Sequence, residues 1–176
     1  SYYVAGVVGI MIAKIMGITD EDVLDRACDL GIAFQLTNIA RDVMDDAKAD
    51  RVFVPQSLFH DKGIKGTVKE LLDQRNLPAI HEAVIVQLSL ADRYYRSSKA
   101  GIKALPFRCS WAMYAALNVY SDIGSRIKKQ GPSAWSNRVS SSHLRKLYLS
   151  FLALFSIFLN KTAVDVSREN LYKRPR

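Results

Sequence analysis

The stretch DLGIAFQLTNIARDVMDDAKADR, which runs from Asp29 to Arg51, decides the fold of this chain of 176 residues. At the helical repeat of about 100° per residue, its amide and acid side chains share one stripe roughly 80° wide. The stripe consists of Gln35, Asn38, Asp42 and Asp46. Most of the remaining circumference is apolar, whereas a surface helix presents a broad charged face to water. We therefore predict a buried helix whose narrow polar stripe faces an internal cavity.

Two carboxylates of this stripe, Asp42 and Asp46, stand one helical turn apart, roughly 6 Å along the axis. They repel each other, and burial raises the cost. A hard divalent cation removes this penalty, since Mg²⁺ takes one or two carboxylates together with waters and substrate phosphate oxygens. The D-x-x-x-D spacing by itself also occurs on solvated helix faces that bind nothing. The apolar flanks, the Asn38 amide, and Arg41 and Arg51 on either side of the acids favour a metal–diphosphate site.

Five segments, spread over nearly the whole chain, form a combination that is far more specific than any one of them. They are SYYVAGVVG (residues 1–9), LGIAFQLTNIARDVMDD (30–46), DRVFVP (50–55), SWAMYAALNVYSDIG (110–124) and GPSAWSNRVS (131–140). Together they closely resemble the bacterial phytoene synthases, which belong to the squalene/phytoene synthase family of head-to-head prenyl transferases.

The resemblance implies a fold that agrees with the absence of any strand-like alternation in the sequence. We expect an all-α, isoprenoid synthase-type helical bundle around a central cavity. Residues 1–160 would be the carboxyl-terminal part of one prenyl transferase domain, and residues 161–176 a basic, flexible tail. The family's first D-x-x-x-D motif and a motif tyrosine would lie upstream of Ser1, which itself stands where the family has cysteine. The bundle would therefore be incomplete here, and the segment alone would be inactive.

For the complete enzyme, the resemblance implies condensation of two geranylgeranyl diphosphates to phytoene through a cyclopropyl diphosphate, in carotenoid biosynthesis. The cofactor would be Mg²⁺, with Mn²⁺ as the alternative, held by Asp42, Asp46 and Asn38. Asp42, Asp46 and Arg41 are the expected catalytic residues. The expected substrate-binding residues, which would contact the diphosphates or line the cavity, are Gln35, Arg41, Arg51, Tyr120, Arg138, Val4, Val8, Gly9, Phe34 and Leu36.

Two other functions compete with this one. A squalene or dehydrosqualene synthase would share the metal motif but use the shorter farnesyl diphosphate, with NADPH in the reductive case. The RVFVP segment and the carboxyl-terminal pattern favour phytoene synthase. A non-catalytic scaffold of the same family would show degenerate acids, yet Asp42, Asp46, Asn38 and Arg41 are all intact. The sequence leaves the oligomeric state and the use of NADPH open.

The net charge of +8 is unevenly distributed along the chain. Residues 1–50 hold nine acids and four bases, and residues 51–176 hold eight acids and 21 bases. The bases are scattered without interleaved aromatic residues, which argues against nucleic acid and favours a diphosphate substrate and a membrane surface. The longest apolar run, Leu147 to Leu159, is shorter than the roughly 20 residues of a spanning helix. We expect a cytoplasmic protein with two reduced cysteines, compatible with peripheral association at the inner membrane face.

The apolar periodicity predicts six helices. They cover Tyr2–Met16, Asp20–Ala47 with Thr19 as its N-cap, Val68–Leu77, Ala79–Ala100, Phe107–Lys129 and Ser142–Leu159. Residues Gln56–Thr67 are expected to form a polar loop. In the first helix, Gly6 and Gly9 form a notch of small residues that either brings two helices close together or leaves room for a prenyl chain. These two interpretations of the notch are compatible.

Overall fold

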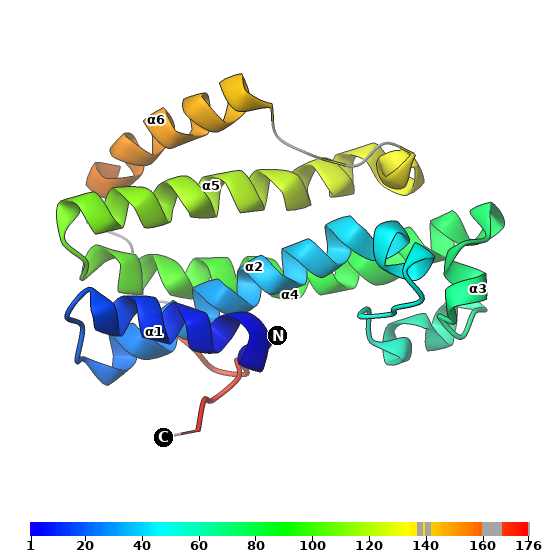
Figure 1. Cartoon of the computed structure of the whole chain (residues 1–176), viewed down its shortest axis with the longest axis horizontal. Coiled ribbons are helices and arrows are strands. Elements are labelled where there is room, and N and C mark those ends of the chain that lie inside the picture. The colour runs from blue at the N-terminus through cyan, green and yellow to red at the C-terminus, as the bar shows by residue number, and fades with distance from the viewer. Residues whose placement is uncertain (137–138, 140–141, 160–166, 176) are drawn as a thin grey trace.

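The computed structural model describes residues 1–136, 139, 142–159 and 167–175. Over this part of the chain it contains helices and no strand, which confirms the predicted all-α fold (Figure 1). The elements are η1 (Tyr2–Gly6, a π-helical turn), α1 (Val7–Ile15), α2 (Glu21–Lys48), η2 (Gln56–Lys62), α3 (Val68–Leu71), η3 (Gln74–Asn76), α4 (Leu77–Lys103), α5 (Phe107–Gln130), η4 (Gly131–Trp135) and α6 (His143–Leu159).

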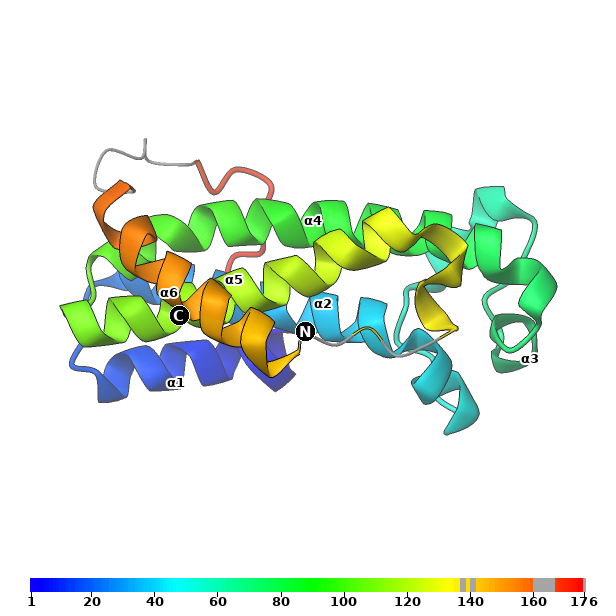
Figure 2. The same cartoon turned by 90° about the horizontal axis from the view of Figure 1, so that it is seen from above.

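Helices α2 and α4 form the centre of the bundle and pack most extensively against each other. Helix α5 runs along both of them, and α6 packs on the outer side of α5 (Figures 1 and 2). Helix α1 and the turn η1 lie against the amino-terminal half of α2. None of the described helices combines the length and the apolar character that crossing a membrane requires.

The start of α2 differs by one residue from the prediction. The carboxylate of Asp20, and not the hydroxyl of Thr19, caps the helix, because it accepts hydrogen bonds from the backbone N–H groups of Asp22 (2.9 Å) and Val23 (3.1 Å). Thr19 as the N-cap is therefore wrong. Asp is as good a cap as Thr, and Glu21 and Asp22 in the first turn add favourable charge at the positive end of the helix dipole.

The segment between α2 and α4 contains two further corrections. Residues Gln56–Lys62 form a 3-10 helix, and not part of a polar loop, because Phe59 is fully buried in a core cluster that also holds Val84 and Ile127. The helix predicted at Val68–Leu77 ends already at Leu71. The side chain of Asp73 then accepts a hydrogen bond from the Arg75 N–H at 3.0 Å and starts a separate turn.

A second core cluster joins the amino-terminal half of α2 to α4 and α5, with Ala33, Tyr95 and Tyr114 among its buried members. Cys28 belongs to this cluster, and its thiol is free, as is that of Cys109. Burial and the neighbouring negative charges raise the pKa of Cys28 to about 11, so this thiol stays protonated at neutral pH.

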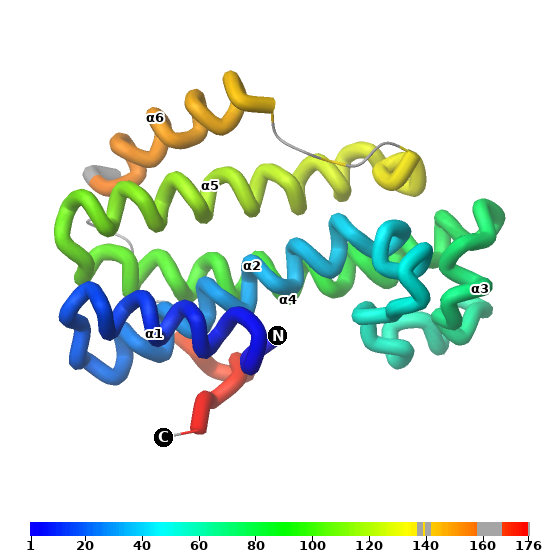
Figure 3. Tube along the Cα trace, viewed as in Figure 1, coloured from blue at the N-terminus to red at the C-terminus, as the bar shows by residue number. Residues whose placement is uncertain are grey.

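The segment 167–175, which belongs to the tail predicted at residues 161–176, makes several contacts with the bundle. Figure 3 shows it passing below the bundle close to the amino-terminal turn, and the rings of Tyr172 and Tyr2 lie 4.9 Å apart between centroids. Arg168 contacts Asp25 (2.8 Å) and Asp29 (2.8 Å) of α2. Leu171 is buried within the second core cluster. These contacts are long-range in sequence, so composition alone could not predict them.

Helix α2 approaches α1 at Gly9 and the turn η1 at Gly31. A Cβ atom added to Gly9 would lie 2.3 Å from the backbone oxygen of Ala27, and one added to Gly31 would lie 2.1 Å from that of Ala5. Both distances are far below van der Waals contact with an atom that cannot move aside. The close-packing interpretation of the glycine notch therefore applies at Gly9.

We expect Gly9→Ala to lower the free energy of unfolding by about 1–3 kcal/mol, because the added methyl group forces α1 away from α2. Urea denaturation of the natural protein measures this change. Gly124→Ala is the matched control, since a Cβ atom there would meet only the end of the Leu88 side chain, at 3.3 Å. It should be neutral or stabilising, because alanine favours the helix. Equal losses in both variants would contradict the close-packing argument.

Candidate active site

The stripe predicted on α2 is present, and its four side chains are partly exposed along one side of the helix. The opposite side is closed, since Ala33, Thr37 and Ala40 are between 0% and 1% exposed. The expectation of a buried helix is thus met on the back of α2, while the four side chains of the stripe are partly exposed. This difference arises because α4 covers the back of the helix and leaves the stripe free.

Arg41 and Asp42 form a two-pronged ion pair at the centre of the stripe. The guanidinium donates from Nε to Oδ1 at 2.8 Å and from Nη2 to Oδ2 at 2.5 Å, and each side chain is 20% exposed. The hydrogen bonds to Asp42 raise the pKa of Arg41, and the nearby Tyr120 adds to this effect. The pair brings a permanent cation to the same place as the acids, which suits the binding of a diphosphate.

Asp46 lies one turn further along and is 18% exposed at its side chain. Burial raises its pKa, the charges of Asp42 and Asp45 raise it further, and Arg51, 3.4 Å away, opposes them. A carboxyl group with a raised pKa is one whose negative charge lacks sufficient compensation. A divalent cation shared with Asp42 would supply that compensation.

The amide of Asn38 offers a second sign that these residues fit a cation. Its Oδ1 atom is buried and accepts no hydrogen bond from the part of the chain that the structure describes. Such an orphaned oxygen is costly unless a ligand completes it. The described residues hold no cluster of three or more His, Cys, Asp and Glu side chains that could form a metal cage. Two carboxylates and an amide oxygen are the kind of ligands that a divalent cation takes together with water and phosphate oxygens.

An apolar pocket of about 220 Å³ lies beside the amino-terminal half of α2. Residues of η1, α1, α2, α4 and α5 line it, among them Val4, Val8, Gly9 and Phe34, which are predicted from the sequence as candidate cavity walls. The fifth candidate, Leu36, packs against the second core cluster instead. Gly9 thus contacts α2 and also borders the pocket, and room for a prenyl chain at this residue stays a prediction.

Two aromatic rings connect the pocket to the polar stripe. Phe34 borders the pocket and stacks on Tyr120 of α5, with ring centroids 4.3 Å apart. Phe34 itself directly precedes Gln35, the first residue of the stripe, in α2. The apolar and the charged parts of the candidate site are therefore adjacent, as the ends of an amphipathic substrate require. Arg138, another candidate, lies outside the described residues.

The sequence analysis missed several polar residues that contact α2 from other elements. Gln87 of α4 is only 3% exposed, and its Nε2 donates to the Leu36 carbonyl at 2.8 Å. Trp135 of η4 donates from Nε1 to the Ala40 carbonyl at 3.1 Å. A glutamine between the buried apolar residues Val84 and Leu88 of α4 was the available signal for the first of them.

A helical bundle in which an acid- and amide-bearing helix passes an apolar pocket is the architecture of the isoprenoid synthases. The chain belongs to the squalene/phytoene synthase family, whose model matches residues 1–147. It is 42% identical to the 15-cis-phytoene synthase of Paracoccus sp. (strain N81106 / MBIC 01143), over 99% of this chain and 56% of that protein. It is 43% identical to the phytoene synthase of Pseudescherichia vulneris, again over 99% and 56%. The chain thus spans about half the length of the curated relatives that it matches.

Proposed function

We propose that the chain is the carboxyl-terminal part of a phytoene synthase, which joins two geranylgeranyl diphosphates head to head in carotenoid biosynthesis. One observation carries the proposal: an acid–amide stripe with an orphaned amide oxygen adjoins an apolar pocket through Phe34 and Tyr120. The resemblance to bacterial phytoene synthases over 99% of the chain supports it. A prenyl diphosphate has the same two parts, a charged head and an apolar chain.

The charged head would be held by the stripe and the residues around it. Arg41, Arg51 and Tyr120 would contact diphosphate oxygens, with Gln35 and Arg138 as further candidates. Asp42, Asp46 and Asn38 would hold Mg²⁺, or Mn²⁺ in its place. When bound, the cation would neutralise negative charge that develops on the departing diphosphate. A guanidinium at Arg41 would stabilise the same charge in a site of low polarity, where it is more effective than in water.

The apolar pocket would hold a prenyl chain and exclude water. Among the residues that the structure describes, its walls carry no acid, and Arg26 is the one base, so a carbocation would meet no strong nucleophile there. The reaction would proceed through a cyclopropyl diphosphate that rearranges to phytoene. The volume of about 220 Å³ is below the roughly 300–1,000 Å³ of typical ligand pockets, so it suits part of one chain. We propose that the rest of a longer synthase completes the cavity and supplies a second acidic motif, and that residues 1–176 alone are inactive.

Product analysis of the natural protein, supplied with Mg²⁺ and either geranylgeranyl or farnesyl diphosphate, tests the proposal. Phytoene from the C20 substrate, lost with a chelator and restored by Mg²⁺, is the expected result. Squalene or dehydrosqualene from the C15 substrate would support the competing synthase. If neither substrate gave a product, the result would favour the non-catalytic scaffold. Turnover by residues 1–176 alone would overturn the proposal that they are inactive.

The proposed partner is a prenyl diphosphate, and the proposed location is the cytoplasm with peripheral contact to the membrane. Helix α6 exposes apolar side chains on one surface, together with the bases Arg145 and Lys146. The apolar ones are Leu144, Leu147, Tyr148, Phe151 and Phe155. Co-sedimentation with anionic liposomes tests this contact, and binding that does not depend on lipid would exclude it.

A further inference from the structure

Three backbone carbonyls of α2 are held by side chains outside the helix. The Ala33 carbonyl accepts from the Thr37 hydroxyl at 2.9 Å, and the Tyr95 hydroxyl donates to Thr37 Oγ1 at 2.8 Å and lies 3.3 Å from the Ala33 oxygen. The Leu36 carbonyl accepts from Gln87 Nε2 at 2.8 Å, and the Ala40 carbonyl accepts from Trp135 Nε1 at 3.1 Å. Each carbonyl already serves a backbone N–H one turn later, and its second lone pair receives the side chain. These three contacts span two turns of the helix that carries the stripe.

The donors come from elements that do not carry the stripe, and their groups are well enclosed. Gln87 and Tyr95 of α4 are 3% and 5% exposed. The Tyr95 hydroxyl also lies 2.8 Å from Thr37 Oγ1, which itself donates to the Ala33 carbonyl at 2.9 Å. Trp135 is half-buried in η4. A hydrogen bond in such surroundings is directional and is not replaced by water when it stretches.

Two of the three carbonyls, those of Ala33 and Ala40, belong to residues opposite to the stripe, and Leu36 lies to one side of it. At about 100° per residue, Ala33, Thr37 and Ala40 fall on the back of a helix whose front carries Asn38 and Asp42. Two of the three back residues are alanines, which present a smooth surface to α4. Apolar packing has no direction, so a surface of this kind fixes the rotation of the helix weakly. Directional hydrogen bonds at three positions along α2 fix both the rotation of the helix about its axis and its position along that axis.

The chemistry of Gln87 also argues for a role beyond stability. Its Oε1 atom is buried and accepts no hydrogen bond within the described part of the chain, so the residue is only half satisfied. A leucine or methionine would fill the same space without a buried polar atom. Local rules of good packing are broken most often where function requires it.

We propose that Gln87, Tyr95 and Trp135 are positioning residues that hold α2 at the rotation and height at which its stripe binds the cation and the diphosphate. They do not touch substrate themselves. This inference rests on the proposed function, because it concerns how that site is held in place.

The test uses Tyr95→Phe, Trp135→Phe and Gln87→Met, singly and combined, in the natural protein. Each change removes donors while keeping most of the volume. Calorimetric titration with Mg²⁺ in the presence of inorganic pyrophosphate measures binding without turnover. We expect the combined variant to raise the apparent dissociation constant of Mg²⁺ about tenfold, as for groups that orient metal ligands. The single variants should show smaller rises in the same direction, and they carry the test if the combined variant does not fold.

Two matched controls separate positioning from general stability. Tyr114→Phe removes a hydrogen bond to the Lys99 carbonyl of α4 at 3.3 Å, and Trp111→Phe removes one to the Ser150 carbonyl of α6 at 2.8 Å. Both should lower the unfolding midpoint without changing the Mg²⁺ constant. Equal rises in controls and test variants would overturn the inference, as would test variants that match the natural protein. If the natural protein itself binds no Mg²⁺ with pyrophosphate, the proposed function fails first.

Discussion

Replacing Asp42 by asparagine in the natural protein should lower the rate of phytoene formation by about 10²–10³-fold or more, the range found when one group that stabilises a developing charge is removed. Asparagine has the shape of aspartate, so the helix stays intact. The change removes a carboxylate that would bind the cation, and it also separates the two-pronged pair with Arg41 at 2.5 and 2.8 Å. Steady-state turnover of geranylgeranyl diphosphate at several Mg²⁺ concentrations measures the effect.

Asp45→Asn is the control for this change. Asp45 is on the same turn of α2 but outside the stripe, with a side chain that is 52% exposed and 3.8 Å from Lys48. Its replacement should leave turnover within a few fold, because an exposed pair of this kind contributes little. If the Asp42 variant kept nearly full activity, the carboxylate would not belong to the metal site. If both variants lost activity alike, the total negative charge of the helix, and not the stripe, would be responsible.

The parts of the site that the sequence predicts are those that depend on local spacing. Gln35, Asn38, Asp42 and Asp46 lie on one side of α2 because the helical repeat puts them there. Val4, Val8 and Phe34 border one pocket. That they line a common cavity was implied by the resemblance to a known family, because their spacing alone does not predict it. Whether these residues bind substrate stays a prediction.

The parts that the sequence does not predict depend on contacts between distant segments. Phe59 was assigned to a polar loop because its neighbours in sequence are polar, yet it fills a fully buried position. Gln87, a polar residue at a buried position of α4, gave no motif to interpret, and its partner is a backbone carbonyl 51 residues away. Arg168 reads as one more base in a basic tail, although its partner Asp29 is 139 residues earlier. No periodicity or spacing rule connects such residues before the chain is folded.

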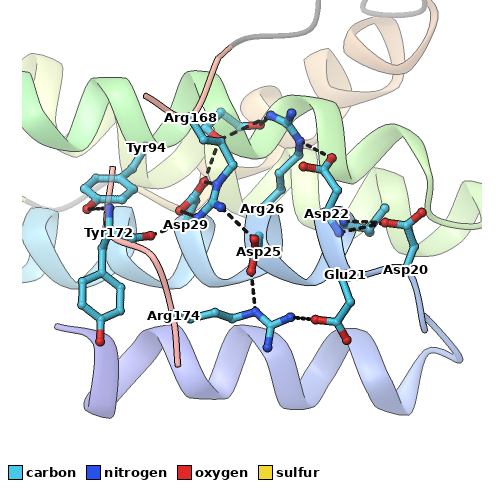
Figure 4. Close-up of polar contacts among 12 residues, drawn as sticks. Asp20, Glu21, Asp22, Asp25, Arg26, Asp29, Tyr94, Arg168, Tyr172 and Arg174 are labelled. Carbon is cyan, nitrogen blue, oxygen red and sulfur yellow. Dashed lines mark hydrogen bonds and ion pairs between the residues drawn. The ribbon is translucent and has the colours of Figure 1, made fainter. Parts of the chain in front are cut away.

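Arg168 has the largest expected effect on stability. Figure 4 shows its guanidinium between Asp25 and Asp29 of α2, with hydrogen bonds of 2.8 Å to Asp25 and of 2.8 and 3.0 Å to Asp29. Asp29 is fully buried and also accepts from the Ser97 hydroxyl at 2.6 Å. Arg174 approaches Asp25 from the same segment at 2.5 Å. Among the ion pairs of the described residues, Arg168 is therefore the cation that contacts the buried carboxylate of Asp29.

We expect Arg168→Met to lower the free energy of unfolding by about 3 kcal/mol, the lower end of the range for breaking a buried pair, because the Arg168 side chain is 15% exposed. Methionine keeps the packing of the aliphatic stem, so the loss reports the uncompensated carboxylate. Urea denaturation at neutral pH measures it. Lys173→Met, which removes an exposed base of the same segment, should change stability by less than about 0.5 kcal/mol.

The double change Asp29→Asn with Arg168→Met shows whether the buried charge is the cause. If it is, the double variant should be more stable than Arg168→Met alone, since neutral asparagine no longer needs a cation, and the two effects will not add. Strict additivity would mean that Arg168 acts through contacts other than Asp29. A loss of under 1 kcal/mol in the single variant would mean that segment 167–175 does not hold α2. In that case the charge on Asp29 must be compensated through Ser97 and the surrounding helix alone, which a buried carboxylate rarely achieves.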